Sequence, residues 1–147
     1  MTRPTSPPVV DAGRLWAGGA ATAVVAALIA LVGVLVSEGL FNLTMVRPPL
    51  IPIGDSFPVR YAITAAVLAL AATGLAHLLV LTTPRPRSFF AWIVGLATLV
   101  GVVLPFALDG TTGGRLATAF VDFVIGVAVL SLLSSVMART TRLPRSA

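Results

Sequence analysis

The sequence predicts an all-α polytopic membrane protein in which four transmembrane helices form one antiparallel bundle. Hydrophobic residues make up 57% of the 147 residues and charged residues only 10%, a balance outside the usual range for a soluble domain. The mean hydropathy of +1.02 points the same way. The apolar residues form runs of about 20, separated by short polar breaks, and each run can cross a hydrocarbon core about 30 Å thick. A four-helix domain is therefore expected over residues 11–139.

The first span is expected at residues 15–36, after a flexible tail at 1–10 that holds three prolines. Asp11 is placed to cap this helix, and Glu38 and Gly39 close it. Arginines before the apolar run imitate a signal peptide. The apolar region of a signal peptide has about 7 to 15 residues, whereas this run continues for about 22. We therefore expect a retained span.

A long outer loop at residues 42–58 follows, and its prolines exclude a further helix there. The apolar residues of this loop include Met45, Leu50, Ile51 and Ile53. They predict that the loop folds back onto the bundle or lies at the membrane interface. Pro58 suits the first turn of a second span, expected at 59–81.

The third span is expected at residues 89–108, after a basic turn at 82–87 with the sequence TTPRPR. Ser88 is placed to cap this helix, and the aromatic residues that follow suit a membrane interface. Pro105 is expected to bend or end the last turn.

A glycine-rich turn at 109–114 leads into the fourth span, expected at 115–137, and a basic tail follows at 140–147. Four spans place both termini on one side. Seven of the ten arginines fall on that side, including those of the 82–87 turn, and three fall on the other. The positive-inside rule then predicts that both termini and the 82–87 turn lie in the cytoplasm. The net charge of +5 forms no basic stripe, so no nucleic-acid partner is expected.

Small residues recur at four-residue spacing and predict the helix faces that pack together, because close approach drives helix association in lipid. The stripes are Gly19, Ala23, Ala27 and Ala30 on the first span; Ala65, Ala69, Thr73 and His77 on the second; Ala91, Gly95, Ala97 and Gly101 on the third; and Thr118, Asp122 and Gly126 on the fourth. His77 and Asp122 are therefore expected between helices.

Asp122 is the main candidate for function, because an aspartate inside a span costs roughly 2.5 to 3.5 kcal/mol on insertion scales. It lies roughly 7 Å from the middle of its span, toward the outer face. Arg60 or Arg115 could reach it from the outer surface. Thr64 or Thr118 could bond to it instead. Two interpretations stay open, a structural pairing of this carboxylate and the handling of a proton or substrate.

His77 is the only histidine, and it lies roughly 17 Å from Asp122 along the membrane normal, so a direct pair is not expected. Ser131 and Ser134 reach a similar depth, which predicts a hydrogen bond with His77. The alternative is a serine-histidine hydrolytic dyad, but no nucleophile-elbow motif accompanies these residues.

Other chemistry lacks the residues it needs. Cysteine is absent, so thiolate metal sites and a cysteine nucleophile are excluded. One histidine cannot supply both axial ligands of a haem, and a zinc site lacks nitrogen and sulfur ligands. No Walker loop or Rossmann glycine pattern occurs. We expect no catalytic residue, no cofactor and no metal site.

Three segments carry a resemblance to a known family. They are VDAGRLWAGGAATAVVAALIALVGVL, LLVLTTPRPRSFFAWIVGLATLVGVVLPF and VDFVIGVAVLSLLSSV. Together the chain resembles an uncharacterised family of small four-span integral membrane proteins of actinobacteria, from Val10 to Arg139. The resemblance implies an inner-membrane four-helix protein without assigned activity, and it carries over no catalytic residue.

The leading hypothesis is a non-enzymatic accessory or interaction subunit, in which Asp122 and His77 hold the bundle together. The lipid bilayer surrounds it, and its partner would be another membrane protein or further copies of the chain. The alternative is a proton-coupled or ion-conducting transporter that uses Asp122 as an oligomer. An intramembrane enzyme is a third and more distant reading.

Overall fold

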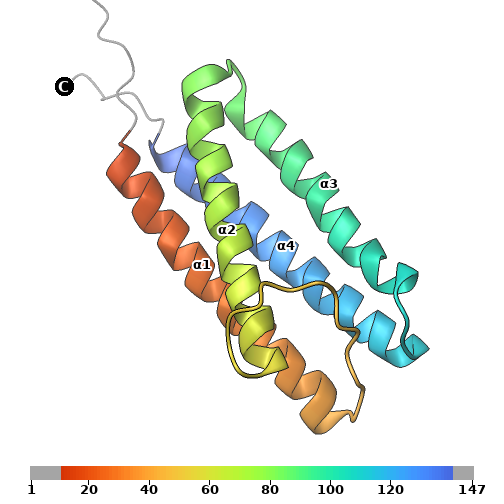
Figure 1. The fold of residues 1–147 in the computed structure, drawn as a ribbon. Helices are drawn as coiled ribbons and strands as arrows, with labels where there is room; N and C mark the ends of the chain where they lie inside the picture. Colours follow the sequence, from red (N-terminus) through yellow and green to blue (C-terminus); the bar gives the residue numbers. More distant parts are fainter. Residues whose placement is uncertain (1–10, 141–147) are drawn as a thin grey trace, which may run out of the picture.

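The computed structural model describes residues 11–140, which form four long helices and no strand (Figure 1). The helices are α1 (Ala12–Val34), which continues directly into a wider turn, η1 (Leu35–Leu40), then α2 (Phe57–Thr82), α3 (Pro86–Ala107) and α4 (Thr112–Thr140). Each of the four is long and apolar enough to cross a membrane. The predicted fold class is confirmed. The tails predicted at 1–10 and, beyond Thr140, at 141–147 lie outside the described residues.

Two of the predicted helix starts are confirmed in detail. The carboxylate of Asp11 accepts a hydrogen bond of 3.1 Å from the backbone N–H of Arg14, as an N-cap does, and also forms a 3.1 Å ion pair with Nε of Arg14. Pro58 lies in the first turn of α2. Its missing N–H has no cost there, because the first turn has no partner for its N–H groups.

The structure corrects the expected limits of α3 and α4. Helix α3 begins at Pro86, so Ser88 lies inside its first turn and does not cap it. Proline is pre-organised for the first helical position, which explains the earlier start. Pro105 lies in the last turn of α3, as expected, and the helix ends at Ala107. The first helix continues through η1 to Leu40, so Glu38 and Gly39 lie at its end as expected, and the N–H of Phe41 reaches the carbonyl of Val36 at 3.1 Å. Helix α4 starts three residues before the expected 115 and extends to Thr140.

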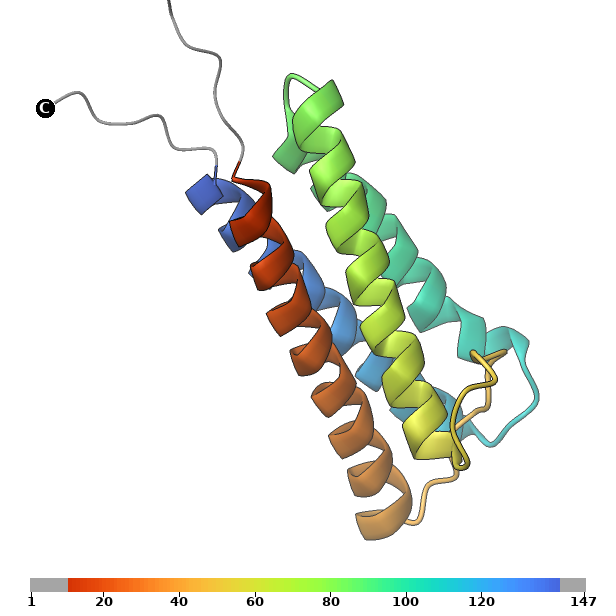
Figure 2. The ribbon, with the colours of Figure 1, turned by 60° about the vertical axis from the view of Figure 1, so that its left-hand side comes forward.

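The helices form an antiparallel bundle in which α1 packs against both α2 and α4 (Figures 1 and 2). Helix α3 packs mainly on α4 and contacts α2 less, while α2 and α4 lie diagonally opposite with little contact. The start of α1, the end of α4 and the α2–α3 turn lie at one end, which we call the terminal end (Figures 1 and 2). The other end, with the loop at 41–56 and the α3–α4 turn, is called the loop end.

Close helix contacts form where a threonine or valine of one helix meets a glycine of another. Thr73 of α2 lies so close to Gly19 of α1 that a Cβ at position 19 would overlap its side chain, and Thr98 of α3 meets Gly126 of α4 in the same way. The two threonine hydroxyls bond to carbonyls of their own helices, Ala69 at 2.9 Å and Val94 at 2.8 Å. With the hydroxyl satisfied locally, each threonine can pack against a neighbouring helix at no polar cost.

The small-residue stripes predicted for α1, α2 and α4 lie at helix contacts, whereas the stripe of α3 is corrected. On α1 and α2, the buried members are Gly19, Ala23, Ala30, Ala65, Ala69 and Thr73. On α3, Ala91 and Ala97 are exposed, and the buried residues are Phe90, Val94 and Pro105. The difference arises because α3 packs mainly on α4 and contacts α2 less, so much of its surface is exposed.

The loop at 41–56 folds back onto the bundle, as predicted. Met45 and Val46 are 2% and 3% exposed, and the backbone N–H of Val46 donates to the hydroxyl of Thr118 at 3.0 Å. The N–H of Ile51 donates to the hydroxyl of Thr64 at 3.2 Å. Ile53 is an exception, since 59% of its surface is exposed. The loop is thus fixed to α2 and α4 about two turns from the start of each helix.

Candidate functional site

Asp122 of α4 accepts a hydrogen bond through Oδ1 from the phenol of Tyr61 on α2. Tyr61 is 4% exposed and Asp122 is partly buried. This is the one side-chain hydrogen bond between α2 and α4 among residues 11–140. Asp122 makes no other hydrogen bond and no ion pair within that part of the chain, so Oδ2 keeps its capacity to accept.

The aromatic residues before Tyr61 connect this pair to the loop end. The ring of Phe57 stacks on the ring of Tyr61, with centroids 5.7 Å apart and planes at 22°. The guanidinium of Arg47 lies over the ring of Phe57, 5.2 Å from its centroid. These contacts restrict the rotamer of Tyr61 and hold its hydroxyl toward Asp122.

The structure corrects the partners expected for Asp122. Nε of Arg60 donates to the carbonyl of Gly54 at 2.9 Å, and Nε of Arg115 is buried without a hydrogen-bond partner. The hydroxyls of Thr64 and Thr118 bond to carbonyls of their own helices and accept from the loop. Arg60, Thr64 and Thr118 thus bond to the backbone of the loop, and the partner of Asp122 is Tyr61.

Tyr61 is the site residue that the sequence analysis missed. It is the only tyrosine in the chain and directly follows Arg60, one of the residues considered as a partner. The charge of Asp122 directs attention to arginine, whereas the phenol of Tyr61 is a neutral donor. The available signal was an amphipathic phenol at the same end of the bundle as Asp122, because a buried tyrosine hydroxyl normally finds a partner.

Asp122 also lines a cleft of about 370 Å³ between α2 and α3, with α4 at its base. The lining residues are Ala65, Leu68, Ala69, Ala71, Ala72, Leu75, Ile93, Val94, Ala97, Thr98, Gly101, Asp122, Ile125, Gly126 and Val129. Thr98 and Asp122 are the only polar side chains among them, and the hydroxyl of Thr98 already bonds to Val94. The cleft is therefore an apolar space with one carboxyl group.

The order of the lining residues places Asp122 at one end of this cleft. Ala65 and Gly101 lie nearest the loop end on α2 and α3, as Asp122 does on α4, and the lining runs to Leu75 near the terminal end. A Cβ at Gly101 would lie 3.8 Å from Cβ of Asp122, so the glycine directly adjoins the carboxyl group. The cleft extends over about ten residues of α2, or roughly 15 Å.

His77 does not take part in this site, and its predicted contact is corrected. Its ring lies 6.5 Å from the ring of Trp16 on α1, at 53°, and its Nδ1 is buried without a hydrogen-bond partner. Ser131 is exposed, its carbonyl accepts from Ser135 at 2.9 Å, and neither Ser131 nor Ser134 bonds to His77. The reason is the arrangement of helices, because α2 and α4 lie diagonally and α1 supplies the neighbour of His77.

The separation predicted between His77 and Asp122 follows from the Tyr61 hydrogen bond. That bond places Tyr61 next to Asp122, and His77 lies 16 residues farther along α2, or roughly 24 Å. No direct pair between the two groups is possible.

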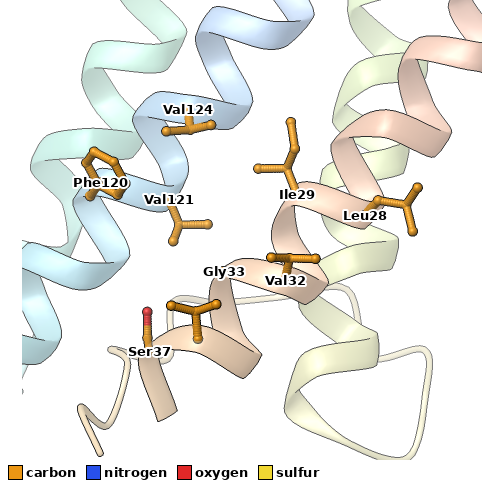
Figure 3. Close-up of a pocket in the computed structure, with 9 residues that line it drawn as sticks. Leu28, Ile29, Val32, Gly33, Ser37, Phe120, Val121 and Val124 are labelled. Carbon is orange, nitrogen blue, oxygen red and sulfur yellow. The ribbon is translucent and has the colours of Figure 1, made fainter. Parts of the chain in front are cut away.

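A second cavity, of about 400 Å³, lies between α1 and α4 and is shown in Figure 3. Its lining residues are Leu28, Ile29, Val32, Gly33, Val36, Ser37, Phe120, Val121 and Val124. The hydroxyl of Ser37 is its only polar side-chain group. A third, more polar hollow of about 290 Å³ at the loop end is lined by Glu38, Asn42, Thr44 and Arg47. Within residues 11–140, no three histidine, aspartate or glutamate side chains are grouped as metal ligands would be.

Comparison with known proteins gives one finding. Residues 10–142 match the model of a family described as a family of unknown function (DUF6069). No curated protein and no solved structure matches this chain. The match covers almost the same residues as the resemblance described above. The matched residues include the four apolar helices, and the family description assigns no activity.

Proposed function

This chain belongs to the DUF6069 family of unknown function, and we propose that it acts as a non-enzymatic accessory or interaction subunit of a membrane assembly. The observation that supports this proposal is the hydrogen bond from Tyr61 to Asp122. It uses the one carboxyl group that lies well inside a span to hold α2 against α4. A group engaged in this way contributes to the geometry of the bundle.

The proposed setting is the plasma membrane, with both termini and the α2–α3 turn in the cytoplasm. Arg85 in the turn, Arg87 at the start of α3 and Arg139 at the end of α4 support this orientation, because arginine is enriched in cytoplasmic segments. The abundance of alanine and the exclusive use of arginine as the basic residue suit a GC-rich actinobacterial source. The partner is another membrane protein or further copies of this chain.

A second candidate function is transport of a proton or ion by an oligomer. The observation in its favour is that Asp122 lines the cleft between α2 and α3 and has one oxygen without a hydrogen bond. Against it, the rest of the cleft is apolar, and Thr98 has its hydroxyl engaged within α3. A path for ions would need further polar groups from a second chain.

One experiment separates the two functions. The full-length chain, tagged at its native level of expression, is extracted in mild detergent, and the same chain alone is reconstituted in proteoliposomes under a pH gradient. If the chain is an accessory subunit, one membrane protein co-purifies with it at fixed stoichiometry. When that membrane protein carries the tag instead, this chain co-purifies with it. The proteoliposomes then show no more flux than empty vesicles. A flux that Asp122→Asn abolishes would instead establish transport.

A further inference from the structure

We propose that the cleft between α2 and α3 binds one small cationic amphiphile, with its ammonium group on Oδ2 of Asp122 and its hydrocarbon part along the apolar walls. The site goes beyond the accessory role and does not depend on it. Four observations support this assignment, namely the polarity of the walls, the state of the carboxyl group, the size of the cleft and the absence of a competing cation.

The walls fit a hydrocarbon body. From the carboxyl group toward the terminal end, the cleft is bounded by residues such as Ala69, Ala72, Val94 and Val129. None of these side chains can bond to a polar group, so the body of a ligand here has to be apolar. The volume of about 370 Å³ is at the lower end of the range for small-molecule sites.

Oδ2 of Asp122 can accept a hydrogen bond from a ligand, and a positively charged donor suits it best. Tyr61 occupies Oδ1, and no residue among 11–140 donates to Oδ2. No arginine in that part of the chain lies within ion-pair distance of Asp122, and Nε of Arg60 is engaged by Gly54. A cation in direct contact stabilises a carboxylate in an apolar space more than a neutral donor does, because hydrogen bonds between charged groups are the stronger ones.

The size of the cleft fits one hydrocarbon chain that lies along it. The cleft is roughly 15 Å long and has a volume of about 370 Å³. It accepts a chain of methylene groups, and an anionic lipid headgroup would be repelled by Asp122.

The test measures saturable binding of radiolabelled decylamine to the full-length chain in nanodiscs of neutral phosphatidylcholine, after subtraction of empty nanodiscs. Decanol and decanoate have the same chain length with a neutral and an anionic headgroup. We expect decylamine to bind at one molecule per chain and decanol to bind more weakly, by roughly 10-fold or more. We expect decanoate not to bind.

Two variants locate the binding. Asp122→Asn keeps an oxygen for Tyr61 and should weaken decylamine roughly 10- to 150-fold, the range for the loss of a hydrogen bond to a charged group. Gly101→Leu fills the cleft beside the carboxyl group and should abolish saturable binding. Its matched control is Gly95→Leu, the same change six residues earlier on α3, where a Cβ meets nothing within 4 Å.

The result that would overturn the proposal is equal binding of decylamine and decanol that neither Asp122→Asn nor Gly101→Leu reduces. Such a result would mean that decylamine binds outside the cleft, as it would by partitioning into lipid. Equal loss in the Gly95→Leu and Gly101→Leu proteins would also overturn it, since the effect would then not depend on the cleft. Elution volume and helical circular dichroism show that each variant is folded, and the Gly101→Leu comparison stands if Asp122→Asn fails this check.

Discussion

Tyr61 and Asp122 join two helices that otherwise have little contact, because α2 and α4 lie diagonally across the bundle. The hydrogen bond therefore sets the position of α2 relative to α4 near the loop end, and it fixes the carboxyl group at the end of the α2–α3 cleft. One neutral donor thus replaces the arginine that the charge pattern suggested.

Tyr61→Phe should reduce the free energy of unfolding by about 0.6 to 1.7 kcal/mol, the usual to upper range for side-chain hydrogen bonds measured within membranes. The change removes the hydroxyl and keeps the ring on Phe57, so the loss reports the bond to Asp122. Unfolding by a denaturing detergent measures it. In an Asp122→Ala background, Tyr61→Phe should have no further effect, and an undiminished effect there would show that the hydroxyl acts elsewhere.

Gly126→Ala should destabilise the bundle by about 1 to 3 kcal/mol, because a Cβ at this position would overlap Thr98 and force α3 away from α4. The matched control is Gly95→Ala on α3, where a Cβ meets nothing within 4 Å. Alanine there should be neutral or stabilising by up to about 1 kcal/mol, since glycine is unfavourable inside a helix. Detergent unfolding of both variants compares them. Equal loss of stability would argue against the close α3–α4 contact.

Thr118→Val should release the loop at 41–56, because it leaves the buried N–H of Val46 without its acceptor. A loss of about 1 kcal/mol corresponds to a roughly fivefold increase in hydrogen exchange at that amide. Hydrogen-deuterium exchange with mass spectrometry measures it. Thr98→Val is the control, since its hydroxyl bonds only to Val94 in its own helix, and exchange in the loop should not change.

Much of the fold could be predicted because its signals are local. The length of each apolar run and the prolines between runs define four spans, and single residues such as Asp11 and Pro58 mark helix starts. The start of α3 was less accurate, because the helix begins at Pro86 and Ser88 does not cap it. Proline is tolerated at a helix start and can also lie in a last turn, so it does not mark a unique boundary.

The site could be predicted only in part, because it depends on how the helices are rotated and spaced. Asp122 stood out by its charge, but its partner is decided by which face of α2 meets α4, and that depends on tertiary packing. The cleft arises because α3 packs on α4 through Gly126 and leaves α2 partly uncovered. The expected contact of His77 with Ser131 or Ser134 failed for the same reason, since depth alone does not give the neighbour.

The orientation proposed from the arginines can be tested on an unmodified background, because the chain contains no cysteine. Ser56→Cys at the loop end and Thr83→Cys in the α2–α3 turn place single thiols at opposite ends of the bundle. In intact cells, a membrane-impermeant maleimide should label Ser56→Cys and leave Thr83→Cys unlabelled until the membrane is opened. Both positions lie directly outside α2, so each thiol is close to a membrane surface. The reverse pattern would place the termini outside and refute the positive-inside assignment.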